Sequence, residues 1–335
     1  MKCIRLIFII FFSVGTNFLL AQPKWVNVDE QFQPLPKNFH VYKTTDSLDG
    51  KPFIAYYAEA KLKDKDLDFT TDTTYKRRLT PQQFFEKNNQ PLLVVNSTFF
   101  NFDKNQNLNV VIKDGKVVSY NIHTISGRGK DTFTYKHPMG SAIGISKKRK
   151  PDVAWVFADS SHEFSFASQR PYQAYKDSAT GFLFKSVSKN IILFQREIGA
   201  RHGENYDPHL NKWKMKTAVG GGPVLVQDGT IKITNNEELK FGGKAIDDKH
   251  PRTCMGYTKD GRLIVMVIQG RFPGKADGAT LTQQARLLVA LGCEEALNLD
   301  GGGSSCMLIN GKETIKPSDK EGERAVPAVF IIKYK

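Results

Sequence analysis

The sequence predicts an α+β fold with a sheet-rich, largely antiparallel or mixed core and few helices. Four turn dipeptides, Asp114-Gly115, Asp228-Gly229, Asp260-Gly261 and Asn310-Gly311, each lie between apolar or β-branched runs. A tight hairpin turn needs positive φ at its central residues, which Asn, Asp and Gly adopt most readily. The dipeptides therefore indicate hairpins along much of the chain, whereas one segment carries a clear helix signal and a second suggests a shorter helix.

The clearer helix is predicted between Thr280 and Gly292. Thr280, with Gln283 three residues later, matches a capping box, and the apolar residues that follow recur on one face. The glycine then ends the pattern. A shorter helix is predicted to begin at Thr80-Pro81, because proline is favoured at the first helical position.

Residues 1–22 are predicted to be a signal peptide. Lys2 and Arg5 form a basic start, an apolar run follows, and small residues precede Gln22. No cysteine follows that exit, so we expect an exported protein, periplasmic or secreted, without a stable membrane anchor. Residues 23–90 are more polar and predict an N-terminal lead-in layer or small subdomain, followed by a main domain over residues 91–335.

The formal net charge of +14 bears on the choice of partner. A basic exported protein is expected to meet polyanionic glycans or phosphate-bearing substrates rather than nucleic acid. Beyond the signal, Cys254, Cys293 and Cys306 are an odd number of cysteines, which allows at most one internal disulfide. Their spacing matches no zinc pattern, and buried free thiols are the simplest interpretation.

The stretch from Asn298 to Ser305 is the strongest candidate for chemistry. An apolar run ends in one carboxylate, Asp300, and three glycines and two serines follow it. Consecutive glycines suit positive φ or a close approach to the backbone, and their N–H groups can form an anion-binding nest. An acid beside such a nest favours chemistry on a negatively charged substrate. The alternative is a glycine-rich hairpin turn.

Three more segments place polar residues where predicted strands begin or end. Asn96 follows an apolar strand and can orient a sugar hydroxyl or a phosphate, or simply start a turn. Arg252 begins a strand, and Arg271 follows Gln269-Gly270 at the end of another. An arginine at such a point can clamp a phosphate or lie on the surface. If these ends meet at one rim, the set suits a phosphate-containing substrate better than ordinary glycoside hydrolysis, which usually needs two carboxylates.

Together these segments resemble the phosphodiester glycosidase family, from about Leu92 to the C-terminus. Each match is short, but their order and the long last block make chance similarity improbable. The matching stretches are Asn96 to Phe100, Gly220 to Pro223, Arg252-Thr253 with Gly256, Gly270-Arg271, Thr280-Leu281 with Ala285, and Asn298 to Ser305.

The resemblance implies hydrolysis of a sugar-1-phosphodiester of a phosphorylated glycan, giving a free sugar and a phosphomonoester. By matching position, it makes Asp300, Arg252, Arg271 and Asn96 the leading catalytic candidates. The expected substrate-binding residues are Gly221, Gly222, Thr253, Gln269, Asn298, Gly302, Gly303 and Ser304.

Two positions depart from the family's pattern. The family commonly has Asp-Gly-Arg where this chain has Gln269-Gly270-Arg271, and Glu where this chain has Gln283. The missing carboxylate leaves open a phosphoglycan-binding protein without catalysis. A metal-assisted phosphodiesterase, with Asp300 as a Ca²⁺ or Mg²⁺ ligand, is the other alternative. No cofactor is predicted to be required, and a divalent metal is allowed.

Overall fold

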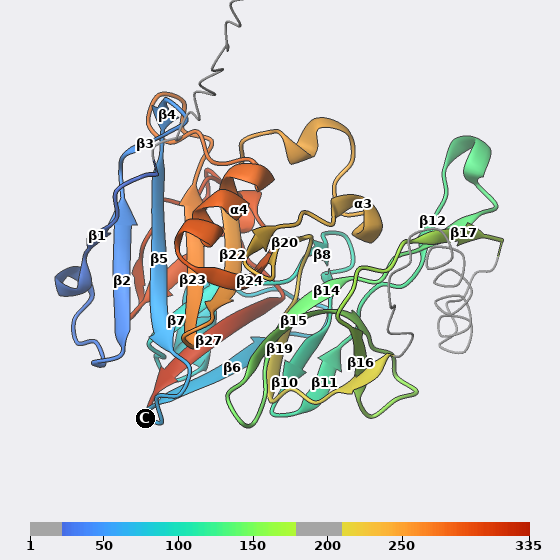
Figure 1. The fold of residues 1–335 in the computed structure, drawn as a ribbon, viewed down its shortest axis with the longest axis horizontal. Coiled ribbons are helices and arrows are strands. Elements are labelled where there is room, and N and C mark those ends of the chain that lie inside the picture. The colour runs from blue at the N-terminus through green and yellow to red at the C-terminus, as the bar shows by residue number, and fades with distance from the viewer. Residues whose placement is uncertain (1–21, 179–209) are drawn as a thin grey trace, which may run out of the picture.

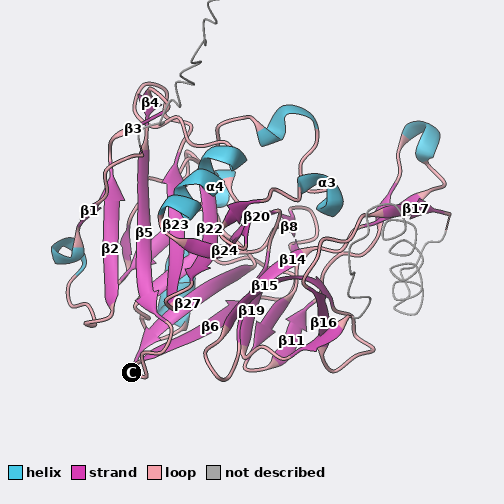
Figure 2. Cartoon of the chain, in the orientation of Figure 1, coloured by secondary structure: helices cyan, strands magenta, loops and turns pink. Residues whose placement is uncertain are grey.

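The computed structural model describes residues 22–178 and 210–335 (Figure 1). The predicted signal peptide, apart from Gln22, lies outside the described residues. Within them the architecture is dominated by β-sheets, with few helices (Figure 2). Every strand pair there is antiparallel, including each pair within the three largest sheets. The predicted sheet-rich α+β fold is confirmed.

The largest sheet of the described residues has eight strands and carries much of the candidate site. Its central strands are apolar on both faces, as expected for a sheet covered on both sides. In sheet order the strands are β1 (Val26–Asn27), β2 (Phe39–Thr44), β5 (Ile54–Lys61), β23 (Arg262–Gln269), β22 (Arg252–Thr258), β24 (Cys293–Asn298), β20 (Val224–Gln227) and β21 (Thr230–Ile231).

A seven-stranded sheet lies beside it, with its central strands buried. In order, its strands are β11 (Lys116–Ser119), β10 (Val111–Lys113), β19 (Thr217–Gly220), β14 (Ser141–Ile145), β15 (Pro151–Phe157), β16 (Ser165–Ser168) and β18 (Asn211–Trp213).

A five-stranded sheet completes the main layers, and three small sheets decorate them. The five strands are β26 (Lys312–Glu313), β25 (Met307–Ile309), β7 (Leu93–Asn96), β27 (Ala328–Tyr334) and β6 (Leu67–Thr73). The small sheets are β12 (Ile125–Ser126) with β13 (Tyr135–His137) and β17 (Tyr175–Asp177), β3 (Ser47–Leu48) with β4 (Lys51–Pro52), and β8 (Phe100–Asn101) with β9 (Gln106–Asn107).

Both predicted helices are present, with the predicted caps. In α4 (Leu281–Ala290) and α1 (Pro81–Lys87), a threonine and a glutamine three residues later form a complete capping box. Figure 1 shows α4 lying across one face of the eight-stranded sheet. The other helical segments are α3 (Asn235–Glu238), η1 (Asp29–Phe32), η2 (Gly129–Asp131), η3 (Gly243–Ile246) and η4 (Gly302–Ser304).

The main core lies where the three large sheets face one another. Phe39, Leu93 and Trp155, one from each sheet, belong to the same buried cluster. Successive side chains of β23 point to opposite faces of the eight-stranded sheet, so each face packs against a different core. Val265 packs into this cluster, while Ile264 packs under α4.

The predicted hairpin turns connect strands as expected. Asp114-Gly115, Asp228-Gly229 and Asn310-Gly311 have positive φ at both residues. They join β10 to β11, β20 to β21 and β25 to β26. At Asp260-Gly261, between β22 and β23, only the glycine has positive φ, so this connection is a longer turn.

The segment before residue 90 contributes strands to the large sheets. β5 pairs with β23, and β6 pairs with β27, so chain from both sides of residue 90 shares the same sheets. The division into residues 23–90 and 91–335 stays a prediction. Cys254, Cys293 and Cys306 are free and buried, as expected for apolar strand positions.

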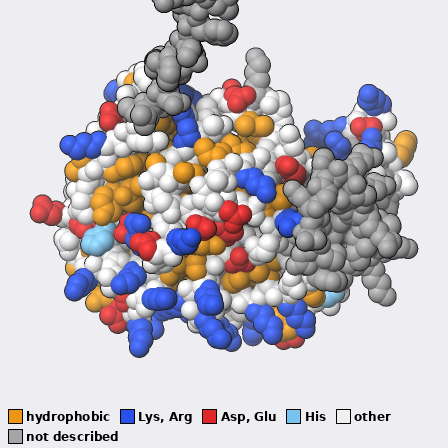
Figure 3. Space-filling model, viewed as in Figure 1, with side chains coloured by type: hydrophobic (Ala, Val, Ile, Leu, Met, Phe, Trp, Pro, Cys, Tyr) orange, Lys and Arg blue, Asp and Glu red, His pale blue; other side chains and the backbone are white. Residues whose placement is uncertain are grey.

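Basic side chains are most frequent along the lower margin of the face in Figure 3. Among the described residues, no helix is long and apolar enough to cross a bilayer.

Candidate active site

The predicted site segments meet at one rim, because antiparallel neighbours bring the start of one strand to the end of the next. Arg252 at the start of β22 pairs with Ile268 near the end of β23. On the other side, Cys254 pairs with Asn298, the last residue of β24. The five-stranded sheet joins this rim through Asn96, the last residue of β7, whose side chain contacts β22.

Asp300 sits where β24 leaves the sheet. Its backbone N–H donates to the carbonyl of Ser97 (2.9 Å), and its own carbonyl accepts from Nδ2 of Asn96 (2.6 Å). The next residue, Gly301, is extended, and Gly302 takes φ +62° before the short turn η4. Its backbone N–H donates to the carbonyl of Pro251 (2.8 Å). The glycine run, residues 301–303, is therefore a tight loop fixed at both ends, not a hairpin turn. We call it the glycine loop.

Burial of its carboxyl raises the pKa of Asp300 to about 7. The hydroxyl of Ser304, the positive charge of Arg324 and the backbone N–H of Gly301 act in the opposite direction and lower that pKa. The residue as a whole is half-buried. A carboxyl balanced in this way changes protonation near neutral pH, which is the property required of a general acid or base.

Asn96 is completely buried, and its amide is used inside the protein. Its Oδ1 accepts from the hydroxyl of Thr253 (2.8 Å) and from the backbone N–H of Cys306 (3.1 Å). Its Nδ2 holds the Asp300 carbonyl. Asn96 thus ties together β7, β22 and the two ends of the glycine loop. Its place is behind Asp300, where it positions the loop.

Arg252 is 3% exposed, and its guanidinium donates to backbone carbonyls. Nε donates to Ala279 (3.0 Å), and Nη2 donates to Asp248 (3.0 Å) and, more weakly, to Ala245 (3.5 Å). The guanidinium also lies 5.7 Å from the centre of the Phe241 ring. Burial lowers the pKa of Arg252 to about 10. Its contacts thus anchor the chain before β22 and before α4.

Arg271 is exposed, forms no ion pair with any described residue, and has φ +66°. A methyl group placed on Gly302 would lie 2.9 Å from its Nη2, so the guanidinium passes directly over the glycine loop. Burial, together with the positive charges of Arg252 and Arg271, lowers the pKa of His250. The structure therefore gathers Arg271, Arg252, His250 and the glycine loop, and leaves the Arg271 guanidinium open to an anion.

Gly221 and Gly222 form the opposite wall of the rim and pack against the end of β24. The backbone N–H of Gly222 donates to the carbonyl of Asn298 (2.8 Å), and Asn298 Nδ2 donates back to the carbonyl of Gly222 (2.9 Å). A methyl group on Gly221 would lie 2.4 Å from the Asn298 carbonyl oxygen. The close approach of the two segments explains the glycines. Oδ1 of Asn298 is buried and has no partner among the described residues.

Gln269 lies at the end of β23, where the family pattern has an acid. Its Oε1 accepts from the backbone N–H of Lys316 (2.9 Å), so the amide holds a neighbouring loop. Thr253 is fully buried and, as noted, donates to Asn96. Ser304 is buried beside the Asp300 carboxyl. All twelve sequence-predicted site residues thus belong to this one region, some facing inward and some lining the open side.

Two basic residues near the site, Arg324 and Lys240, were not predicted from the sequence. Arg324 forms a two-pronged ion pair with Asp319 (2.7 and 2.9 Å), and a methyl group on Gly303 would lie 2.1 Å from its Nη2. It therefore borders the glycine loop at Gly303, and Oδ1 of Asp319 would lie 2.2 Å from the same methyl group. Both residues of the pair lie in the loop before β27, and no periodic pattern marks them there.

Lys240 is the second. Its Nζ lies 5.2 Å from the centre of the Phe99 ring, and its Cε would lie 2.5 Å from a methyl group on Gly222. Burial lowers its pKa. The nearby Glu238 carboxylate accepts five hydrogen bonds from other groups, and no described carboxylate forms an ion pair with Lys240. The ammonium thus has an aromatic neighbour, while the charge of Glu238, which forms no ion pair with it, acts in the opposite direction and raises its pKa.

Within residues 22–178 and 210–335, no three His, Cys, Asp or Glu side chains gather closely enough to hold a metal ion. The groups nearest the Asp300 carboxyl that affect its charge are a hydroxyl, a backbone N–H and a guanidinium. That set suits an anion more than a cation.

Comparison with known proteins gives a family match and several partial relatives. The model of the phosphodiester glycosidase family matches residues 89–333. An uncharacterised protein derived from the SPbeta prophage of Bacillus subtilis is 38% identical over 141 residues, which cover 33% of this chain and 22% of that protein. The N-acetylglucosamine-1-phosphodiester alpha-N-acetylglucosaminidase of Bos taurus is 34% identical over 103 residues, covering 28% of this chain and 19% of the bovine protein. The match thus spans about a fifth of the length of these curated relatives.

Two solved structures share the fold. The catalytic domain of the zebrafish N-acetylglucosamine-1-phosphodiester alpha-N-acetylglucosaminidase, described as auto-inhibited by its pro-peptide, aligns with a TM-score of 0.55 at 20% identity. The alignment covers 94% of this chain and 89% of that one. A hypothetical protein from Synechocystis aligns with a TM-score of 0.63 at 12% identity, over 94% of this chain and 64% of that one.

Proposed function

The chain belongs to the phosphodiester glycosidase family, and on that premise we propose that it hydrolyses the bond between a sugar's anomeric carbon and phosphate. The substrate would be a sugar-1-phosphodiester of a phosphorylated glycan, with an N-acetylglucosamine-like sugar. The products are the free sugar and a phosphomonoester. Because residues 1–22 have the pattern of a signal peptide, we propose that the protein acts after export, in the periplasm or outside the cell.

One observation carries the proposal: the Asp300 carboxyl, whose pKa burial raises to about 7, lies beside a glycine loop that two guanidinium groups border. Arg271, which has no ion-pair partner among the described residues, crosses the loop on one side. Arg324, which is paired with Asp319, borders it at Gly303. A guanidinium beside the loop attracts the negative charge of a phosphodiester and can donate hydrogen bonds to its oxygens. This arrangement supports binding of the phosphodiester with the anomeric carbon near Asp300.

The proposed reaction needs only one carboxylate because of its leaving group. Water forms a bond to the anomeric carbon while the bond from that carbon to the phosphate oxygen breaks. The bonding electrons leave with the phosphomonoester, whose charge Arg271 stabilises, so protonation by a strong acid is less necessary. Asp300 serves as the base that takes the water's proton, as the nucleophile of a two-step course, or as the stabiliser of an oxocarbenium-like centre. Gln269, bonded to the Lys316 backbone, is assigned no proton transfer.

Replacing Asp300 tests this assignment most directly. Asp300→Asn removes the charge with little change of shape, and we expect release of sugar from an α-sugar-1-phosphodiester to fall by about a thousandfold or more. Asp114→Asn is a matched control, since Asp114 lies exposed in a hairpin turn at φ +50° that asparagine also adopts. Undiminished turnover in a folded Asp300→Asn protein would remove Asp300 from the mechanism.

Isotope incorporation separates the proposed reaction from cleavage of the other ester bond. In ¹⁸O-labelled water, attack at the anomeric carbon places the label in the sugar. A metal-assisted phosphodiesterase places it in the phosphate instead. We further propose that no divalent metal is required, and expect activity to survive extensive chelation by EDTA. Label in the phosphate together with loss of activity on chelation would favour the phosphodiesterase.

A further inference from the structure

A cleft separate from the Asp300 rim has a volume of about 850 Å³. It lies between the chain that follows β6, the turn joining β8 to β9, and the chain that follows β11. Cavities of about 300–1,000 Å³ commonly enclose small-molecule ligands. None of the residues assigned to the Asp300 site lines this cleft.

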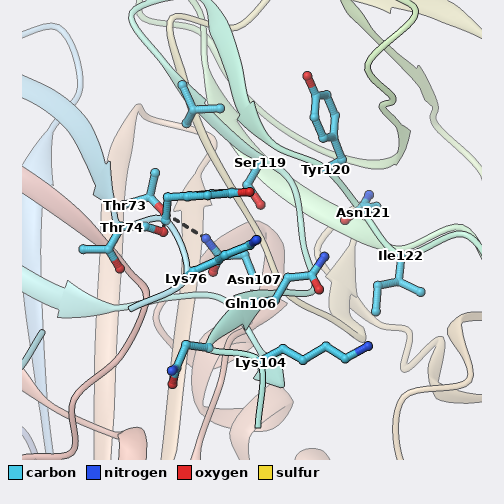
Figure 4. Close-up of a pocket in the computed structure, with 13 residues that line it drawn as sticks. Thr73, Thr74, Lys76, Lys104, Gln106, Asn107, Ser119, Tyr120, Asn121 and Ile122 are labelled. Carbon is cyan, nitrogen blue, oxygen red and sulfur yellow. Dashed lines mark hydrogen bonds between the residues drawn. The ribbon is translucent and has the colours of Figure 1, made fainter. Parts of the chain in front are cut away.

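Aromatic rings stand at the cleft with large parts of their surface in solvent. Tyr75 is 82% exposed and Tyr120 is 40% exposed, and Ile122 beside them is 38% exposed. In Figure 4, Lys76 and Gln106 extend into the space between the wall formed by Thr73 and Thr74 and the wall formed by Tyr120, Asn121 and Ile122. Exposed aromatic rings at a polar cleft are the surfaces on which sugar rings stack, because each ring offers a flat apolar face and tyrosine adds a hydroxyl.

The charges of the cleft have one sign. Lys76 and Lys104 line it, no Asp or Glu lines it, and neither lysine forms an ion pair with any described residue. Lys76 Nζ lies 5.2 Å from the centre of the Tyr75 ring. Unpaired lysines beside an aromatic face favour an anionic group on the ligand.

One wall of the cleft is held by side-chain hydrogen bonds. Asn107 is fixed, since its Nδ2 donates to the Thr73 hydroxyl (2.8 Å) and its Oδ1 accepts from Thr98 (2.5 Å). The wall that carries Lys104 and Gln106 is therefore fixed next to Asn107.

We propose that this cleft binds an oligosaccharide that carries phosphate or sulfate groups. The sugar rings stack on Tyr75 and Tyr120, and Lys76 and Lys104 bind the anionic substituents. The cleft shares a wall with the Asp300 site, because Thr98 contacts Asn107 while the preceding residue, Ser97, accepts from the Asp300 backbone. The cleft is therefore placed to hold glycan close to the reaction without taking part in it.

Isothermal titration calorimetry with the full mature chain tests the proposal. The probes are phosphorylated maltohexaose, sulfated maltohexaose, unmodified maltohexaose and glucose 6-phosphate. None of them contains a sugar-1-phosphodiester, so binding is measured independently of the proposed hydrolysis. We expect the two charged hexasaccharides to bind at least about tenfold more tightly than the neutral one and than glucose 6-phosphate. Equal binding of charged and neutral hexasaccharides overturns the role of the lysines. Equal binding of glucose 6-phosphate leaves only an anion site and overturns the oligosaccharide.

Substitutions then place the binding in this cleft. Tyr75→Ala combined with Tyr120→Ala, and Lys76→Gln combined with Lys104→Gln, are each expected to weaken binding of a charged hexasaccharide by at least about tenfold. Phe133→Ala is the aromatic control, since Phe133 is 85% exposed in the chain before β13. Lys148→Gln is the control for charge. Unchanged affinity in both double variants, with thermal unfolding confirming their fold, overturns the proposal whether or not the protein hydrolyses phosphodiesters.

Discussion

Two sides of the rim around Asp300 use their polar side chains in opposite ways. On the closed side, formed by Asn96, Thr253 and Arg252, the side-chain groups bond to other parts of the protein, and each residue is almost fully buried. On the open side, formed by Arg271 and the glycine loop, the guanidinium has no ion-pair partner among the described residues and passes over the half-buried Gly302. The difference separates residues that hold the site in shape from residues that are free to bind substrate. Residues of both kinds belong to the stretches that match the family.

The largest expected effect concerns the closed side. Arg252→Met keeps the apolar stem of Arg252 but removes its donors to the carbonyls of Ala279, Asp248 and Ala245. Because buried acceptors would lose their partners, we expect the free energy of unfolding to fall by about 3–5 kcal/mol. Urea unfolding measures it, with Arg128→Met, at an exposed arginine, as the control. A loss below about 1 kcal/mol would mean that Arg252 is free to bind phosphate, and the contrast between the two sides would fail.

Arg271→Ala tests the open side. Since Arg271 has no partner to lose, stability should hardly change. The charge that stabilises the leaving phosphate disappears, so we expect kcat/KM for a sugar-1-phosphodiester to fall by about 10²–10³-fold, or about 3–4 kcal/mol of transition-state stabilisation. Arg128→Ala serves as the matched control for removal of an exposed guanidinium. Full activity in Arg271→Ala would place the phosphate elsewhere, with Arg324 beside the glycine loop and Lys240 beside Gly222 as other basic groups near the site.

Asp300 lies between the two sides. Its raised pKa fixes the direction in which its ionisation changes the free energy of unfolding as the pH rises. Its folded-state pKa is about 7, against an ordinary value of 3.8, so the folded protein retains a proton that the unfolded chain releases between these values. The stability due to that proton is full below about pH 4 and is lost as the pH rises through 7. Asp300→Asn does not titrate, so above pH 7 it should be more stable than the wild type by roughly 2–4 kcal/mol.

Chemical unfolding of both proteins from pH 4 to pH 8 measures this difference. We expect the two stability curves to converge toward pH 4 and to separate by pH 8. Since titration of all the other groups is shared, the difference reports Asp300. Curves that stay parallel over this range would show that the carboxyl is not held in an unfavourable charged state. The proposed balance between burial and the nearby donors would then be wrong.

The sequence was sufficient to predict which strand ends carry polar residues. It could not distinguish the two sides of the rim. Hairpin turns and capping boxes are local signals, so α4 and the turns at residues 114 and 310 could be predicted from a few neighbours. Whether Arg252 points inward depends on strand register and on the later segments that cover it, which no local pattern encodes.

The missed residues follow the same logic. Lys240 and Arg324 both reach the site from loops. Lys240 lies near Gly222 in space, and Arg324 lies near Gly303, but no sequence motif links either pair. Lys240 comes after the short helix α3, and Arg324 follows Asp319 in an irregular segment before β27. A loop residue's approach to a site is set by tertiary packing, so composition and periodicity give no signal for it.

The smallest expected effect concerns Gly302, whose backbone conformation and lack of a side chain leave room for the Arg271 guanidinium. Gly302 has φ +62°, and a methyl group there would lie 2.9 Å from Nη2 of Arg271. Gly229 has φ +68°, but a methyl group there would meet nothing nearer than 3.9 Å. Both alanine substitutions should therefore lose about 1–2 kcal/mol of stability from the left-handed backbone alone. Only Gly302→Ala displaces the guanidinium, so only it should raise KM for the phosphodiester, by several-fold. If Gly302→Ala and Gly229→Ala have the same KM, the position of Arg271 does not depend on the glycine loop. The glycine loop would then not belong to the open side of the rim.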